Sequence, residues 1–136
     1  MHILFVTGEY PPMEGGVGAY TAELAQALAR QGARVSVATG MDAEMAEPHD
    51  RAITRYPVVE RWTPGIWSSI PDLAKEIKAD WIHVQYQTAA YAMNPAINFA
   101  LGHWRRALPG AGLAWTYHDV LVPFVFPKAG ELLGRW

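Results

Sequence analysis

The sequence contains no cysteine, carries little net charge and has no long apolar run. The missing cysteines exclude disulfide bonds and thiolate metal sites, and they fit a reducing compartment. A formal net charge of −2 gives no electrostatic argument for binding nucleic acid or an anionic membrane. No apolar run approaches the roughly 20 residues of a membrane span, and the N-terminus lacks the basic region of a signal peptide. We therefore expect a cytoplasmic protein.

Several signatures of catalytic and cofactor sites are also missing. There is no Gly-Lys-Ser/Thr sequence of a Walker A loop and no Gly-x-Ser-x-Gly nucleophile elbow. No group of His, Asp and Glu has the spacing of metal ligands, so we expect neither a metal nor a bound cofactor. The dinucleotide fingerprint G-x-G-x-x-G does not follow the first predicted strand, and no acidic residue ends the second.

The composition is instead that of a folded domain. The 136 residues are 51% hydrophobic and 18% charged, which indicates one globular domain with one hydrophobic core. The sequence has six tryptophans and six tyrosines, many for its length. Aromatic side chains suit binding surfaces, although core packing is their commoner use.

The chain begins with a strand, a stiff loop and a helix. Residues 2–7 form a short apolar run rich in β-branched and aromatic side chains, which predicts a buried strand. A loop with two adjacent prolines follows, and residues 17–31 have the periodicity of a helix. Gly15 and Gly16 precede this helix and carry no Cβ, so a ligand can approach the backbone. A helix N-terminus of this kind suits phosphate or carboxylate.

The rest of the chain repeats the alternation of strands and helices. Further strands are predicted at 34–39, 52–57, 80–86 and 113–117, and helices at 67–78 and from Asn94 and Pro95 to about residue 108. Parallel strands joined by right-handed crossovers predict an α/β fold, a Rossmann-like doubly wound parallel sheet with strand order 3-2-1-4-5.

In such sheets a ligand binds outside the carboxyl ends of the strands where the winding reverses, here between the first and fourth strands. The residues offered there include Glu9, Tyr86 and Gln87, with His118 and Asp119 one strand further out. His118 is the best candidate for chemistry, because a histidine can donate to a phosphate or a sugar hydroxyl and can move a proton.

Structural alternatives exist for these residues. The glycines of the first loop also suit a tight turn and close packing of a helix, without any ligand. His118 also suits a structural role in capping the turn that follows it. The apolar segment 120–127 is able to cradle a lipid or aromatic acceptor, but such a segment more often covers a sheet edge or packs on a neighbouring domain.

The order of these motifs resembles a known family. A strand, Pro-Pro, Gly-Gly and a helix, followed by Asp80-Trp-Ile-His-Val-Gln85 and Thr116-Tyr-His-Asp119, resemble the N-terminal half of the family 4 glycosyltransferases. These are retaining, nucleotide-sugar-dependent enzymes of the GT-B fold, and the resemblance covers nearly the whole chain. In that family two Rossmann-like domains face each other across a cleft. The N-terminal domain mainly binds the acceptor, and the C-terminal domain holds most of the nucleotide sugar.

The resemblance implies roles for several residues. Gly15, Gly16 and Val17 match the glycine loop of the family, which lies against the diphosphate of the donor and the acceptor. His118 matches the histidine that lies beside the transferred sugar, which makes it the catalytic candidate. The other candidates are substrate-binding positions by topology only: Glu9, Tyr86, Gln87 and Asp119.

The sequence differs from the family pattern in the features of the C-terminal domain. The C-terminal domain, its Arg/Lys pair and its Glu-x7-Glu motif are absent. We therefore expect a truncated N-terminal domain of a hexosyltransferase that is inactive alone. Its expected partners are a nucleotide sugar, a sugar or lipid-linked acceptor and the missing domain, with peripheral contact at the inner face of a membrane. The alternatives are a stand-alone nucleotide- or phosphate-binding module and a non-catalytic partner subunit.

Overall fold

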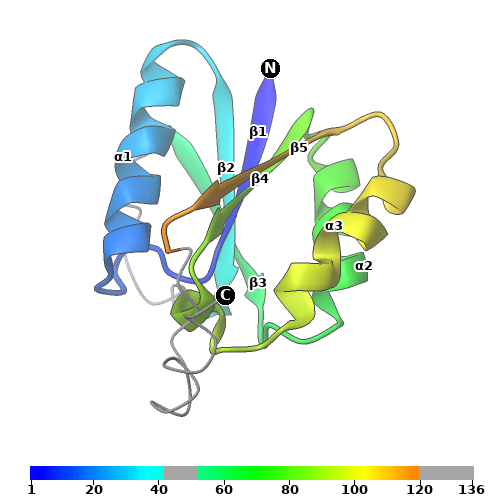
Figure 1. The fold of residues 1–136 in the computed structure, drawn as a ribbon. Coiled ribbons are helices and arrows are strands. Elements are labelled where there is room, and N and C mark those ends of the chain that lie inside the picture. The colour runs from blue at the N-terminus through cyan, green and yellow to red at the C-terminus, as the bar shows by residue number, and fades with distance from the viewer. Residues whose placement is uncertain (42–51, 120–136) are drawn as a thin grey trace, which may run out of the picture.

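A computed structural model describes residues 1–41 and 52–119. Five strands and the helices that connect them follow one another along these residues, with β2 and β3 consecutive among the described elements (Figure 1). The elements are β1 (His2–Thr7), α1 (Gly16–Arg30), β2 (Arg34–Gly40), β3 (Ile53–Val59), α2 (Ile66–Glu76), β4 (Trp81–Tyr86), the short 3-10 helix η2 (Thr88–Tyr91), α3 (Ala96–Ala107) and β5 (Gly112–Tyr117). The apolar segment 120–127 lies outside the described residues.

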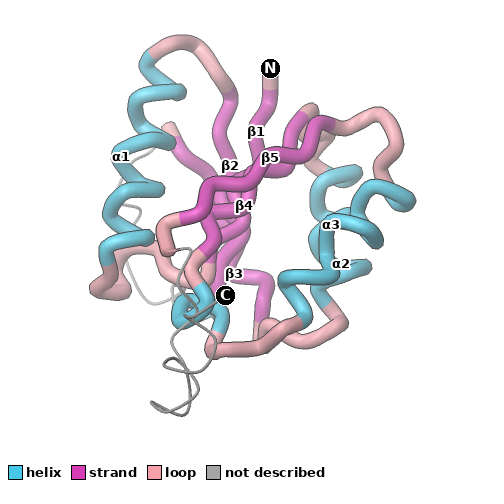
Figure 2. The backbone as a smooth tube through the Cα atoms, in the orientation of Figure 1, coloured by secondary structure: helices cyan, strands magenta, loops and turns pink. Residues whose placement is uncertain are grey.

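The strands form one parallel sheet in the order β3-β2-β1-β4-β5. Helix α1 covers one face of the sheet, whereas α2 and α3 cover the other (Figure 2). The predicted Rossmann-like fold and its strand order are therefore confirmed. The winding reverses between β1 and β4, where Thr7 lies opposite Gln85 in the register.

The alternation of side chains along the strands divides the core into two clusters. Strand β1, in the centre of the sheet, is buried along its whole length. Its Phe5 faces α1 and packs in a cluster with Ala22 and Ala25. Its Leu4 faces the other way, into the cluster that contains Trp104 of α3. A nearly continuous apolar strand is thus used on both faces, as expected of a parallel sheet covered by helices.

Two tryptophans join α2 to α3. Trp67 Nε1 of α2 donates to the carbonyl oxygen of Ala96 at 2.9 Å, and Trp104 Nε1 of α3 donates to that of Ile66 at 3.0 Å. At the start of α3, the Asn94 side-chain oxygen accepts from the Ala96 N–H, in agreement with the predicted cap. These bonds fix α3 on its face of the sheet.

One residue on each of two predicted helix faces points away from the core in the structure. The apolar stripe of residues 17–31 includes Tyr20, which predicts that it faces the core, but it is 48% exposed and Gly18 is buried instead. A Cβ on Gly18 would lie 3.2 Å from the backbone of Glu9 and Tyr10, so this glycine lets α1 approach the first loop. On α3, Leu101 is exposed and Ala100 is buried. In both helices the small residues select the face, because they allow closer packing on the sheet.

The residues that limit helices and strands mostly lie where predicted. Gly32 follows α1 with φ of 86°, the left-handed conformation that glycine accepts without strain. Pro57 lies on the edge strand β3, where a missing N–H costs no ladder bond. Pro71 differs, since α2 begins at Ile66 and Pro71 therefore lies inside the helix rather than near its first turn.

His2 shows no partner at a suggestive spacing in the sequence, which predicts a surface position, but in the structure the residue is 5% exposed. Its Nδ1 donates to the carbonyl oxygen of Ile77 at 3.0 Å, and its Nε2 lies 2.9 Å from Ser36 Oγ. The carbonyl accepts only, so the proton is on Nδ1 and Nε2 accepts from the Ser36 hydroxyl. Both partners come from other elements, and for that reason local sequence did not reveal them.

Three buried or half-buried histidines make stability depend on pH. The pKa values of His2, His83 and His118 all lie below the ordinary 6.5, in each case mainly because burial disfavours the charged ring. The unfolded chain therefore binds more protons than the folded chain below pH 6.5. We expect the free energy of unfolding to be greatest above that pH and to fall as the pH is lowered.

Urea unfolding at about pH 7.5 and about pH 5.5 measures this loss, since the ordinary pKa of histidine lies between the two values. A His2→Gln variant should show a smaller difference between the two. Equal free energies of unfolding at both pH values in the unmodified chain would contradict the interpretation.

Within the part of the chain that the structure describes, no helix is both long and apolar enough to span a membrane.

Candidate functional site

The point where the winding reverses carries polar side chains on the α1 face. Thr7 Oγ1 ends β1 and donates to the carbonyl oxygen of Glu9 at 2.7 Å, which turns the chain into the first loop. Gln85 lies beside Thr7 on β4 and is fully buried. A buried glutamine amide needs hydrogen-bond partners inside the protein.

Gln85 holds the imidazole of His118. Gln85 lies on β4 and His118 directly follows β5, and His118 Nε2 is 2.8 Å from Gln85 Oε1. The His118 N–H also donates to the carbonyl oxygen of Tyr86 at 2.9 Å, which extends the β4–β5 ladder. From α1, the ring of Tyr20 meets that of His118 edge to face, with centroids 4.8 Å apart. We call Tyr20, Gln85 and His118 the His118 cluster.

The hydrogen bond assigns the proton on His118. Gln85 Oε1 only accepts, so His118 Nε2 donates and Nδ1 carries a lone pair. Burial lowers the pKa of His118, which keeps the ring neutral at neutral pH. His118 therefore offers an acceptor nitrogen to a ligand hydroxyl. In this arrangement Gln85 Nε2 is buried without a hydrogen-bond partner among the described residues.

The role of Gln85 in setting the tautomer is testable. In a Gln85→Leu variant, His118 loses the acceptor for its Nε2 proton, and we expect a mixture of the two neutral tautomers in place of one. Nitrogen-15 spectra of the imidazole rings measure this directly. A Thr116→Val variant is the control, because it removes the partner of His83 Nε2, at 2.8 Å, and leaves His118 in place. An unchanged His118 spectrum in Gln85→Leu would overturn the assignment.

Gly15 and Gly16 differ in their surroundings. A Cβ on Gly15 would overlap the carboxylate of Glu9, whereas a Cβ on Gly16 would meet no atom within 4 Å. Glu9 Oε2 is buried and has no hydrogen-bond partner among the described residues. The Glu9 carboxylate thus lies at the N-terminus of α1, where the helix dipole stabilises negative charge. A phosphate at this helix end would lie beside a like charge.

Glu9 also borders a cavity at the carboxyl ends of β1, β2 and β3, which we call the Glu9 cavity. Its volume is about 470 Å³, and its polar lining includes Glu60, Arg61 and Asn94 beside the ring of Trp62. Such a lining of carboxylates, a guanidinium, an amide and an aromatic ring can exchange hydrogen bonds with a ligand rich in hydroxyls.

The predicted site residues divide between the two faces of the sheet. Val17 is 3% exposed, so only its backbone is available to a ligand. Tyr86 and Asp119 line a different pocket, on the side of α3, because neighbouring residues on a strand point to opposite faces. Gln87 is half-buried between β4 and η2. Glu9, the glycines and His118 lie toward α1.

Sequence reasoning missed Gln85 and Tyr20. A signal for Gln85 was present, since a glutamine inside an apolar central strand must find a buried partner. Tyr20 gave no such signal, because its position fitted the predicted core stripe. Among residues 1–41 and 52–119, no three His, Asp or Glu side chains gather as metal ligands.

Comparison with known proteins adds the family. A family model described as Glycosyltransferase Family 4 matches residues 14–136, a range that includes the glycines and His118. No curated protein matches the chain. The family match covers most of the sequence and agrees with the Rossmann-like sheet. The chain therefore belongs to glycosyltransferase family 4.

Proposed function

We propose that this chain forms the acceptor-binding side of a sugar-transfer site in a retaining glycosyltransferase that uses a nucleotide-sugar donor. The observation that carries the proposal is the His118 cluster. A neutral histidine, held by Gln85 and Tyr20, lies at the carboxyl edge of the sheet in a chain of this family. In this proposal His118 contacts the transferred sugar, and Nδ1 accepts a hydrogen bond from one of its hydroxyl groups.

Glu9 supports binding of the acceptor at this edge. Its Oε2 atom is buried without a partner among the described residues, and an unsatisfied buried acceptor costs free energy. An acceptor hydroxyl that donates to Glu9 removes this cost. The Glu9 cavity, with Arg61 and Asn94, then surrounds the remaining hydroxyl groups of the acceptor.

The leaving nucleoside diphosphate requires a different environment. Its departure needs positive charge or hydrogen-bond donors where negative charge develops. At the start of α1 the chain instead presents the Glu9 carboxylate beside Gly15. We therefore propose that the groups that neutralise the diphosphate come from a second domain, and that the isolated 136-residue chain does not transfer sugar. The same carboxylate disfavours a stand-alone phosphate-binding module.

Titration of the isolated chain tests the proposal. Neutral methyl glycosides should shift the nuclear magnetic resonance signals of Glu9, Gly15 and His118, whereas UDP-glucose and GDP-mannose should bind weakly. Binding of either nucleotide sugar with a Kd below about 10 μM would favour the phosphate-binding module instead. Sugar transfer by the isolated chain would contradict the predicted inactivity.

A further inference from the structure

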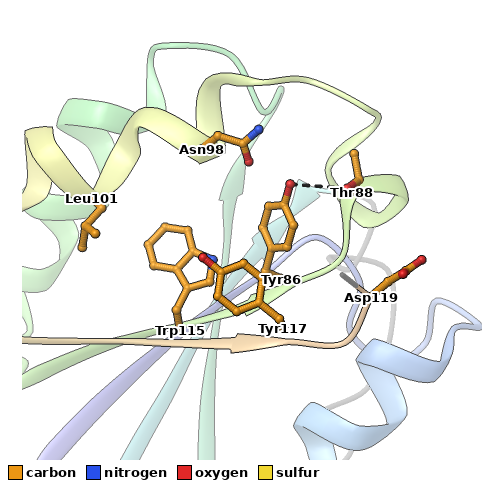
Figure 3. Close-up of a pocket in the computed structure, with 7 residues that line it drawn as sticks. All are labelled: Tyr86, Thr88, Asn98, Leu101, Trp115, Tyr117 and Asp119. Atoms are coloured by element: carbon orange, nitrogen blue, oxygen red, sulfur yellow. Dashed lines mark hydrogen bonds between the residues drawn. The ribbon is translucent and has the colours of Figure 1, made fainter. Parts of the chain in front are cut away.

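A second pocket lies on the opposite face of the sheet from the His118 cluster, between β5 and α3 (Figure 3). We call it the Trp115 pocket. Its volume is about 360 Å³, near the lower end of the roughly 300–1,000 Å³ of ligand pockets. The residues that line it are Tyr86, Thr88, Asn98, Leu101, Trp115, Tyr117 and Asp119. A pocket of this size suits one small ring.

Three aromatic rings form the wall of this pocket. The ring of Tyr86 lies 5.4 Å from that of Tyr117 and 6.5 Å from that of Trp115. Buried rings support them from behind, since Trp104 is 6.2 Å from Trp115 and Tyr91 is 6.1 Å from Tyr86. The rings of Trp115 and Tyr86 are therefore held in place before any ligand arrives, and a ligand pays little to order them, whereas Tyr117 is 61% exposed.

Polar groups stand around the aromatic wall. Trp115 Nε1 is buried and has no hydrogen-bond partner among the described residues, although a buried indole N–H normally finds one. The Asn98 side chain approaches from α3, and the Asp119 carboxylate lies at the end of β5 (Figure 3). The pocket thus combines an apolar surface with both donors and acceptors.

We propose that the Trp115 pocket binds a pyranose ring of a neutral saccharide. A pyranose has an apolar C–H face that packs against aromatic rings and a rim of hydroxyl groups that both donate and accept. Trp115 Nε1 supplies a donor to this rim, and Asn98 supplies both kinds of group.

Charge decides against a phosphorylated ligand. The lining contains the Asp119 carboxylate and no lysine, arginine or histidine. A nucleoside diphosphate also stacks on aromatic rings, but no described residue of this lining offers a positive charge to its phosphates. The proposal takes from the proposed function only the expectation that the substrates are sugars, and it concerns a site on the other face of the sheet.

The test is a titration of the 136-residue chain with methyl α-D-glucopyranoside, methyl α-D-mannopyranoside and N-acetylglucosamine, followed through the Trp115 indole N–H resonance. At least one saccharide should shift this resonance. A Tyr117→Ala variant should bind that saccharide about tenfold more weakly. Phe99→Ala is the matched control, because Phe99 and Tyr117 are 63% and 61% exposed and Phe99 lies outside the pocket. It should change the affinity less than about twofold.

The outcomes separate this site from the His118 cluster. His118→Ala should leave the shift of the Trp115 resonance intact, and UDP should not produce that shift. No shift with any of the three saccharides, or equal effects of Tyr117→Ala and Phe99→Ala, would overturn the proposal. Neither result would affect saccharide-induced shifts at Glu9 and Gly15, which report on the proposed function.

Discussion

Replacement of Trp104 by alanine is expected to destabilise the domain by about 3–5 kcal/mol. Trp104 is fully buried in the cluster between the sheet and α2, and its Nε1 donates to the carbonyl oxygen of Ile66 at 3.0 Å. The variant loses the largest buried side chain of this face, leaves a cavity and removes the indole hydrogen bond to that carbonyl. The loss is comparable with the whole stability of many domains.

Urea unfolding, followed by circular dichroism, measures the change in the free energy of unfolding. Phe99→Ala is a control on the same helix, since Phe99 is 63% exposed and its loss should cost less than about 0.5 kcal/mol. If Trp104→Ala does not fold, Trp104→Phe still tests the argument, because it keeps a ring and removes the hydrogen bond. The free energy of unfolding of Trp104→Phe should then be lower than that of Phe99→Ala but still above zero. A Trp104→Ala variant as stable as the control would contradict the proposed packing.

Replacement of Gly15 by alanine is expected to weaken binding of an acceptor saccharide by roughly 10- to 100-fold, with little change in stability. The added Cβ overlaps the Glu9 carboxylate, which lies at the end of a rotatable side chain and moves aside. The backbone of Gly15 is extended, with φ of 175°, so alanine fits it without strain. The variant therefore displaces the proposed acceptor-binding group and leaves the fold intact.

Gly16→Ala separates the position of Glu9 from a general effect of alanine in the loop. A Cβ on Gly16 meets no atom within 4 Å, so the carboxyl carbon-13 resonance of Glu9 should stay in place in this variant and move in Gly15→Ala. Thermal unfolding of both variants checks that the fold is retained. Unchanged saccharide affinity in Gly15→Ala, despite a displaced Glu9 resonance, would remove Glu9 from the proposed site.

The two expected effects differ in whether the sequence alone predicts the contact on which each depends. Trp104 was predicted to face inward, because it lies on an apolar stripe of helical period. The contact between Glu9 and Gly15 was not predicted, since it depends on the path of the loop between β1 and α1. The Glu9 carboxylate disfavours a phosphate at this helix end, and the proposed ligand is therefore a hydroxyl-rich acceptor.

The difference between local pattern and tertiary contact also explains why two helix residues were wrongly predicted to face the core. Periodicity places an apolar stripe on a helix but does not choose between adjacent stripes when both are mostly apolar. In α1 the buried stripe contains Gly18 and Ala22, and Tyr20 turns toward His118 instead. On α3 Ala100 is buried, whereas Leu101 is exposed and borders the Trp115 pocket. Close packing of backbones decided both cases.

The sequence by itself determined the alternation of strands and helices, the parallel sheet, its strand order and the resemblance to the family. These features depend on local periodicity, on turn residues such as Gly32 and on the handedness of crossovers, all of which act within one or two elements. Only the tertiary structure decided which side chains meet. It joined Gln85 to His118, placed Glu9 against Gly15 and turned Tyr86 away from both. Such contacts join residues far apart in the chain, and their geometry is fixed by packing of the sheet against its helices.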